Sequence, residues 1–247
     1  MIALLAVLAG IVGLGAGFVV QRCSRRYVPV ATPLGDDSDT TEGDRVTVAV
    51  AARQAVGVRV SVPIPAVATA VLFGLAAWRF GASWQLPAFL ALAAAGVLLA
   101  VVDLEHRLLP NCIVGPAAAT GAVLLGLAAA VGGQGHDLVR ALLGAATLFV
   151  AYLVLALIAP SGLGMGDVKL AGLLGLYLGW LGWGAVLFGA VAGFVVQAVV
   201  ALLLLATRRI GLRGELPFGP AMLAGAALVI AWPPVWDAVS LVAAGRM

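Results

Sequence analysis

The sequence predicts an all-α membrane protein that crosses the bilayer about eight times. Of its 247 residues, 63% are hydrophobic and only 10% are charged, whereas soluble domains contain roughly 25% charged residues. Apolar runs long enough to span a bilayer recur along the whole chain. Short segments rich in Gly, Pro and Arg separate these runs. We therefore expect a single integral-membrane domain over residues 1–247, and the composition excludes an ordinary water-soluble globule.

The first apolar run, residues 2–20, predicts a retained membrane helix and not a cleaved signal peptide. Its positive residues, Arg22, Arg25 and Arg26, follow the apolar run instead of preceding it. That order favours an N-terminus outside the cytoplasm. Residues 22–62 are mostly polar and are expected to form a cytoplasmic loop. The alternation of apolar and basic residues in 45–60 fits both a membrane-surface segment and a short ribbon.

The remaining spans follow from the positions of the apolar runs, which we place at 63–78, 86–102, 112–131 and 138–159. A helix over residues 168–205 would be about 57 Å long, too long for a hydrocarbon core of about 30 Å. The Gly/Trp cluster at 179–184 offers a turn with interfacial tryptophans. We therefore expect two spans to meet at this cluster. The last span is expected at 220–239.

The distribution of basic residues predicts the orientation of these spans. With the N-terminus outside, most Lys and Arg residues fall on loops at the cytoplasmic side, as the positive-inside rule requires. The same topology places Asp103 and Asp167 at cytoplasmic helix ends, with Asp103 opening the polar loop at 103–111. Two aspartates on the same membrane face are therefore expected to approach each other.

Asp167 is a candidate for chemistry because its surroundings are apolar. Asp167 and Lys169 are the only charged residues between Arg140 and Arg208, and a charge within hydrocarbon costs about 2.5–3.5 kcal/mol on insertion scales. Two neighbouring carboxylates repel each other, so one stays protonated while the other is ionised. The ionised group can take a proton from water while the protonated group polarises a peptide carbonyl.

Structural roles compete with this interpretation for each residue. Asp103 fits a solvated loop position, and Asp167 fits a helix N-cap that bonds free backbone N–H groups. Lys169 can pair with a carboxylate or extend to the membrane interface. The rigid segment 217–220 can simply start the last helix.

Three motifs resemble those of one family. The segment Gly164-Met165-Gly166-Asp167-Val168-Lys169-Leu170 closely resembles the G-x-G-D-x-K-L stretch of type IV prepilin peptidases, which are membrane aspartyl proteases of the GxGD type. Asp103, followed by the Leu109-Pro110 pair, resembles the family's other aspartate segment. Pro217-Phe218-Gly219-Pro220 is similar to its third signature. The motifs occur in the family's order.

The resemblance implies an aspartic-type endopeptidase with Asp103 and Asp167 as the catalytic pair. Gly164 and Gly166 would shape the backbone around Asp167, with Lys169, Pro110 and the segment 217–220 in support. Family members remove the basic leader from type IV prepilins and pseudopilins at the cytoplasmic face of the bacterial inner membrane, just before the substrate's apolar stretch. The expected partners are thus such substrates and the lipid bilayer, without nucleic acid or a metal, and no oligomeric state follows.

This sequence departs from the bifunctional members, which carry paired C-x-x-C motifs in the first cytoplasmic loop and N-methylate the product from S-adenosylmethionine. Here residues 22–62 contain only Cys23, and the other cysteine is Cys112. The resemblance therefore implies leader cleavage without implying N-methylation, and S-adenosylmethionine would be a cofactor only if that activity were retained.

Two functions of other classes remain alternatives to the peptidase. A proton-coupled transporter would use intramembrane acids as a relay, but few polar residues besides Gln197 lie deep in the spans. A non-catalytic scaffold for pilus or secretion assembly would need no paired carboxylates at all.

Overall fold

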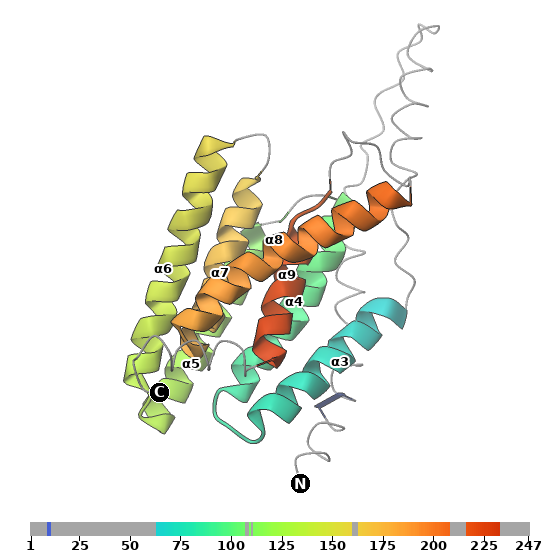
Figure 1. The fold of residues 1–247 in the computed structure, drawn as a ribbon. Helices are drawn as coiled ribbons and strands as arrows, with labels where there is room; N and C mark the ends of the chain where they lie inside the picture. Colours follow the sequence, from blue (N-terminus) through green and yellow to red (C-terminus); the bar gives the residue numbers. More distant parts are fainter. Residues whose placement is uncertain are drawn as a thin grey trace, which may run out of the picture.

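A computed structural model describes residues 9–10, 63–106, 109, 111–159, 163–207 and 216–232, and these residues form helices without any strand. Ala9 and Gly10 are helical. The seven longer helices are α3 (Pro63–Phe80), α4 (Leu86–His106), α5 (Asn111–Gly132), α6 (Gly135–Ile158), α7 (Met165–Leu181), α8 (Trp183–Ala206) and α9 (Gly219–Ala231). Figure 1 shows how they pack together in one bundle.

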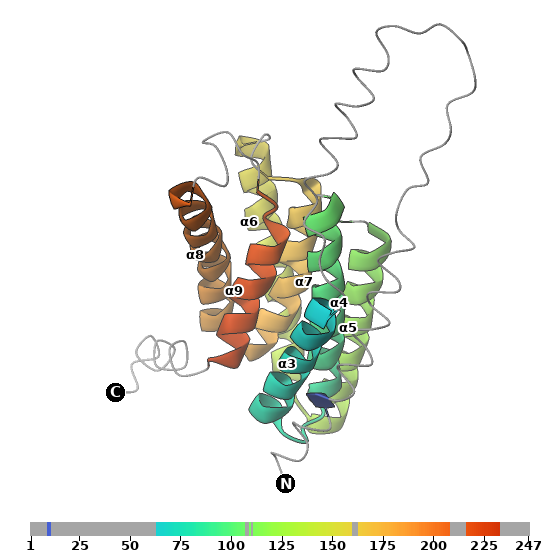
Figure 2. The ribbon, with the colours of Figure 1, turned by 90° about the vertical axis from the view of Figure 1, so that its right-hand side faces the viewer.

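Helix α7 forms the centre of this bundle. Most of its residues are buried, and it packs against α5, α6, α8 and α9. Helices α4 and α9 lie side by side next to it, and α8 crosses the bundle obliquely (Figures 1 and 2). Because Asp167 belongs to the first turn of α7, the central helix positions one of the two candidate aspartates.

The described helices are those of a multi-pass membrane protein. Four of them are long and apolar enough to cross a bilayer: Leu86–Glu105, Ile113–Gly132, Gly135–Ile158 and Trp183–Ala206. Large apolar side chains cover the outside of the bundle; Ile158 is 78% exposed and Leu202 is 65% exposed. Such a surface is unfavourable in water and favourable against lipid tails.

Within the described residues, the helix boundaries agree with most of the predicted apolar segments, and four of these helices are long and apolar enough to cross a bilayer. The break expected at 179–184 falls at Gly182, where a φ of 147° ends α7 and starts α8; this is a backbone conformation that glycine adopts readily. The predicted first span lies outside the described residues except for Ala9 and Gly10, and the loop at 22–62 lies wholly outside them. The predicted last span is described only as far as α9 and the residue after it.

One expectation about the third span is wrong. Asp103 was expected to open a polar loop, but α4 continues through it to His106. The helix continues because the residues after Val102 do not include a helix breaker before Pro110. Asp103 consequently stays on a helical face that packs inside the bundle.

Glycines bring α6 and α7 unusually close together. A Cβ atom built on Gly144 would lie 2.7 Å from the carbonyl oxygen of Gly175, and one built on Gly175 would lie 2.5 Å from that of Gly144. At the end of α7, Arg140 donates hydrogen bonds to the carbonyl oxygens of Gly179 (2.8 Å) and Trp180 (2.6 Å). These contacts fix the position of α7, and therefore of its first turn.

Replacing Gly175 with leucine is expected to destabilise the protein by about 3 kcal/mol, the upper end of overpacking costs, because backbone atoms of α6 cannot move aside. The measurement is thermal unfolding of the purified protein in detergent. Gly126→Leu on α5 is the matched control, since a Cβ there meets nothing within 4 Å. Equal unfolding temperatures for the two variants would contradict the close packing of α6 on α7.

Candidate active site

The first turn of α7 holds Asp167 in place. Gly164 is the N-cap residue, and Asp167 is the third residue of the helix. The Oδ2 atom of Asp167 accepts a hydrogen bond of 3.3 Å from the Gly164 backbone N–H. Asp167 is therefore not the N-cap itself, although it does bond backbone at the start of the helix, as an acidic residue in this position commonly does. Its half-buried side chain is restrained in orientation without being removed from water.

Asp103 lies in a different environment from Asp167. It is only 5% exposed, and its Oδ2 atom has no hydrogen-bond partner among the described residues. A buried polar atom without a partner is costly, so it calls for an explanation. The start of α9 packs directly on this carboxylate: a Cβ built on Gly219 would lie 2.6 Å from Asp103 Oδ2. The expectation of a solvated loop residue is therefore wrong, and Asp103 is held in the interior.

The two aspartates are brought together at one end of the bundle. Their carboxylates lie close enough to repel each other electrostatically, and the backbone N–H of Gly219 lies close enough to stabilise a charge on Asp103. Like charges at short range disfavour simultaneous ionisation. The arrangement therefore provides one carboxyl group that can donate a proton next to one that can accept a proton.

The side chain of Leu109, from the segment that follows Asp103, packs against the other two motif segments at Gly166 and Gly219. A Cβ built on Gly166 would lie 2.7 Å from Leu109 Cβ, and one built on Gly219 would lie 3.5 Å from Leu109 Cδ1. The segments containing Asp103, Asp167 and Gly219 thus meet around a single side chain. The two glycines leave the space that Leu109 and the Asp103 carboxylate occupy.

An aromatic cluster beside the aspartates was not identified from the sequence. Tyr152 of α6, Phe194 of α8 and Phe218 before α9 pack together, with ring centroids 5.0–6.3 Å apart. Tyr152 is 2% exposed, donates a hydrogen bond of 3.5 Å to the Ala190 carbonyl oxygen and lies within electrostatic range of Asp167. The available signal in the sequence was an aromatic residue with a polar hydroxyl group, in a stretch without charged residues between Arg140 and Asp167.

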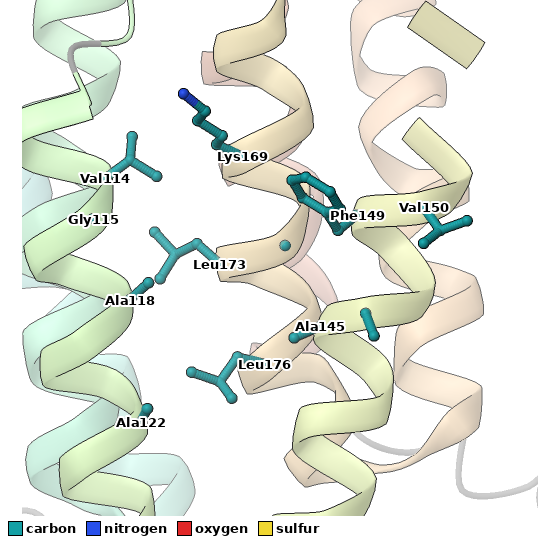
Figure 3. Close-up of a pocket in the computed structure, with 12 residues that line it drawn as sticks. Val114, Gly115, Ala118, Ala122, Ala145, Phe149, Val150, Lys169, Leu173 and Leu176 are labelled. Carbon is teal, nitrogen blue, oxygen red and sulfur yellow. The ribbon is translucent and has the colours of Figure 1, made fainter. Parts of the chain in front are cut away.

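The structure describes most of the remaining predicted site residues, which lie on α7 and around the start of α9. Lys169 lies two residues beyond Asp167 and lines an apolar hollow of about 730 Å³ between α5, α6 and α7 (Figure 3). Pro220 stands in the first turn of α9, and Phe218 is its N-cap, so the helix-start role considered for this motif is confirmed. Pro217 precedes that turn. Pro110 lies outside the described residues.

No group of three or more His, Cys, Asp and Glu side chains is placed to hold a metal ion in the part of the chain that the structure describes. The polar groups at this end of the bundle include the carboxylates of Asp103 and Asp167, which interact with each other. Such a pair can activate a water molecule and protonate a leaving group.

Comparison with known proteins gives the family of a stretch that contains both aspartates. Residues 90–207 match the type IV leader peptidase family. The chain is 31% identical to a prepilin leader peptidase/N-methyltransferase of Pseudomonas aeruginosa over 175 residues, which is 69% of this chain and 58% of the relative. A Bacillus subtilis protein of the same name is 34% identical over 177 residues, covering 70% of this chain and 67% of the relative.

The coverage of these relatives is incomplete. The chain spans about three fifths of the length of the first curated relatives that it matches, 58% to 62% for the three Pseudomonas and Stutzerimonas proteins. No solved structure matches the chain.

Proposed function

This chain belongs to the type IV leader peptidase family, and on that premise we propose that it is a membrane-embedded aspartyl endopeptidase. Its proposed substrates are type IV prepilins or pseudopilins, from which it removes the basic leader peptide. The relatives, which are named prepilin leader peptidases/N-methyltransferases, support the substrate class. The observation on which the proposal rests is the approach of the Asp103 and Asp167 carboxylates where the three motif segments meet.

In the proposed reaction the two carboxyl groups share the work on one water molecule. The ionised group removes a proton from water as the water oxygen attacks the carbonyl carbon of the scissile peptide. The protonated group donates to the carbonyl oxygen, giving a tetrahedral intermediate without a covalent enzyme adduct. Collapse of this intermediate transfers a proton to the leaving amine. The pair titrates as a unit, so we assign the base to the pair and not to one residue.

The finer topology is also part of the proposal. We propose eight spans with the N-terminus outside, the active site at the cytoplasmic face and residues 22–62 as a cytoplasmic loop within one domain over 1–247. The asymmetric distribution of Lys and Arg supports this orientation. It places the aspartates where water and a basic leader can both reach them, in the cytoplasmic membrane of a bacterium.

Of the two activities in the relatives' name, we propose only the peptidase activity for this chain. Residues 22–62 contain a single cysteine in place of paired C-x-x-C motifs, so the methyltransferase activity in that name is not carried over to this chain. The peptidase reaction itself uses protein carboxylates and water, and the proposal includes no cofactor.

Co-expression of the chain with a candidate prepilin tests the proposal. We expect mass spectrometry of the membrane fraction to show a shortened pilin that begins just before its apolar stretch. Cells without the chain should contain only the full-length prepilin. An unshortened prepilin in both strains, for a substrate that a known relative cleaves in the same host, would refute the proposed activity.

A further inference from the structure

A second apolar cavity, of about 630 Å³, lies between α3, α4 and α9 and also touches α7 and α8. Its lining is almost entirely Ala, Val, Leu and Gly; Arg79 is the one charged residue among the described residues that line it. Arg79 lies at the end of the cavity away from Asp103, because the neighbouring Phe80 stacks on Phe89 from the first turns of α4. We call this cavity the α3–α4–α9 groove.

The groove lies on the faces of α4 and α7 that also bear the two aspartates. On α4 it is lined by Phe89, Ala93, Gly96 and Ala100, and these positions fall on the Asp103 side of the helix at about 100° per residue. On α7 the lining residue is Leu174, two turns after Asp167 and on the same side. The groove therefore begins one turn away from Asp103 and runs into the bundle.

Helix α9 forms the other wall of the groove along its length. Pro220, Leu223 and Ala227 line it, and Pro220 directly follows Gly219, which packs against the Asp103 carboxylate. The stretch of α4 from Ala100 back to Phe89 is roughly 16 Å long, about half of the hydrocarbon core. The groove thus connects the candidate active site with the depth of the membrane.

The hollow between α5, α6 and α7 does not have this relation to the aspartates. Its α7 lining includes Lys169, Leu173 and Leu176, and these positions lie roughly 180–240° around the helix from Asp167. Figure 3 shows these side chains directed toward the space between α5 and α6. Of the two cavities, only the α3–α4–α9 groove opens along the aspartate side of both helices.

We propose that the α3–α4–α9 groove binds the apolar segment of the substrate that follows the scissile peptide. This inference rests on the proposed function, in which the cut falls between a basic leader and an apolar stretch. A polypeptide whose scissile bond lies at Asp103 and Asp167 must continue away from them, and the groove offers that continuation an apolar surface lined by small residues. Seating the apolar segment there contributes binding energy to the ground state and the transition state alike, so its loss is expected mainly in KM.

Site-specific photocrosslinking locates the bound segment. A benzophenone amino acid is introduced at Ala227 in the groove or at Ala118 in the other hollow, in the full-length Asp167→Asn chain co-expressed with a prepilin. We expect the Ala227 probe to crosslink to the apolar segment of the prepilin and the Ala118 probe not to do so. Crosslinks from Ala227 only to lipid or to residues 2–20 of this chain, or prepilin crosslinks from Ala118 instead, would overturn the inference.

Filling the groove in the otherwise native chain gives a second readout. We expect Ala227→Phe to raise the KM for leader release at least tenfold with a smaller change in kcat, while Ala118→Phe leaves both unchanged. Ala93→Phe, on the opposite wall, replaces Ala227→Phe if that variant does not fold in detergent. If the native chain releases the leader and the groove variants do so with the same KM and kcat, the groove assignment is refuted and the proposed function is not. A native chain that releases no leader would refute the proposed function and this inference with it.

Discussion

Replacing either Asp103 or Asp167 with asparagine is expected to reduce leader release by about 10³-fold, the middle of the range for general acid–base catalysis. Asparagine is almost the same size as aspartate but can neither accept a proton from water nor exist as a charged base. The structure keeps both residues at one end of the bundle, so each substitution removes half of the proposed pair. The measurement is the rate of conversion of prepilin to shortened pilin in membranes that contain equal amounts of each variant.

The matched control for these two variants is Asp137→Asn. Asp137 lies in the first turn of α6 and forms an ion pair of 2.9 Å with Arg140, beside the end of α7 opposite to Asp167. Because both partners remain partly exposed, the loss of this pair is expected to cost at most about 1 kcal/mol of stability, with leader release unchanged. Native rates for Asp103→Asn and Asp167→Asn would exclude the proposed mechanism.

Replacing Gly219 with alanine is expected to reduce leader release by on the order of 10²-fold with little loss of folded protein. A Cβ there would lie 2.6 Å from Asp103 Oδ2, so either the carboxylate or the start of α9 must move. A displacement of about 1 Å in a catalytic group can cost this much in rate. The measurement is kcat for leader release, with thermal unfolding as the check on the fold.

Gly126→Ala serves as the control for Gly219→Ala, since the added methyl group meets nothing within 4 Å. Alanine favours a helix interior over glycine by about 1 kcal/mol, so this control is expected to be as active as the native chain and slightly more stable. An active Gly219→Ala protein would mean that the Asp103 carboxylate does not need its present position.

The positions of the described helices were largely predictable from the sequence. The apolar run at 112–131 became α5, and the Gly/Trp cluster separated α7 from α8 at Gly182. Both follow from local properties, the length of an apolar run and the conformational freedom of glycine. The end of α4 was not predictable in this way. The polar residues after Val102 are typical of a loop, but in the structure they continue the helix to His106.

The candidate site was predictable in its motifs and not in its contacts. The sequence identified Asp103, Asp167 and the segment 217–220, but not that Gly219 leaves room for the Asp103 carboxylate. That contact joins segments far apart in the chain, and no local pattern encodes it. Leu109 was visible only as part of a Leu-Pro pair, and its position between Gly166 and Gly219 depends on how α4, α7 and α9 pack.

The position of Tyr152, a residue outside any motif, was also not predictable from the sequence. No charged residue lies between Arg140 and Asp167, and a single tyrosine in such a stretch is typical of an interfacial or core residue. Only the packing of α6 against α8 and the start of α9 places its ring against Phe194 and Phe218. The aromatic cluster that lies beside Asp167 is therefore a property of the tertiary structure.

A double-mutant cycle on the two aspartates tests the central claim most directly. Leader release is measured with purified native chain, Asp103→Asn, Asp167→Asn and the double variant, on one prepilin at saturating concentration. Groups that act as a unit lose activity non-additively, so we predict that the double variant is no slower than either single variant. Two partial losses that multiply in the double variant, or leader release at the native rate by either single variant, would contradict the claim that Asp103 and Asp167 form one catalytic pair.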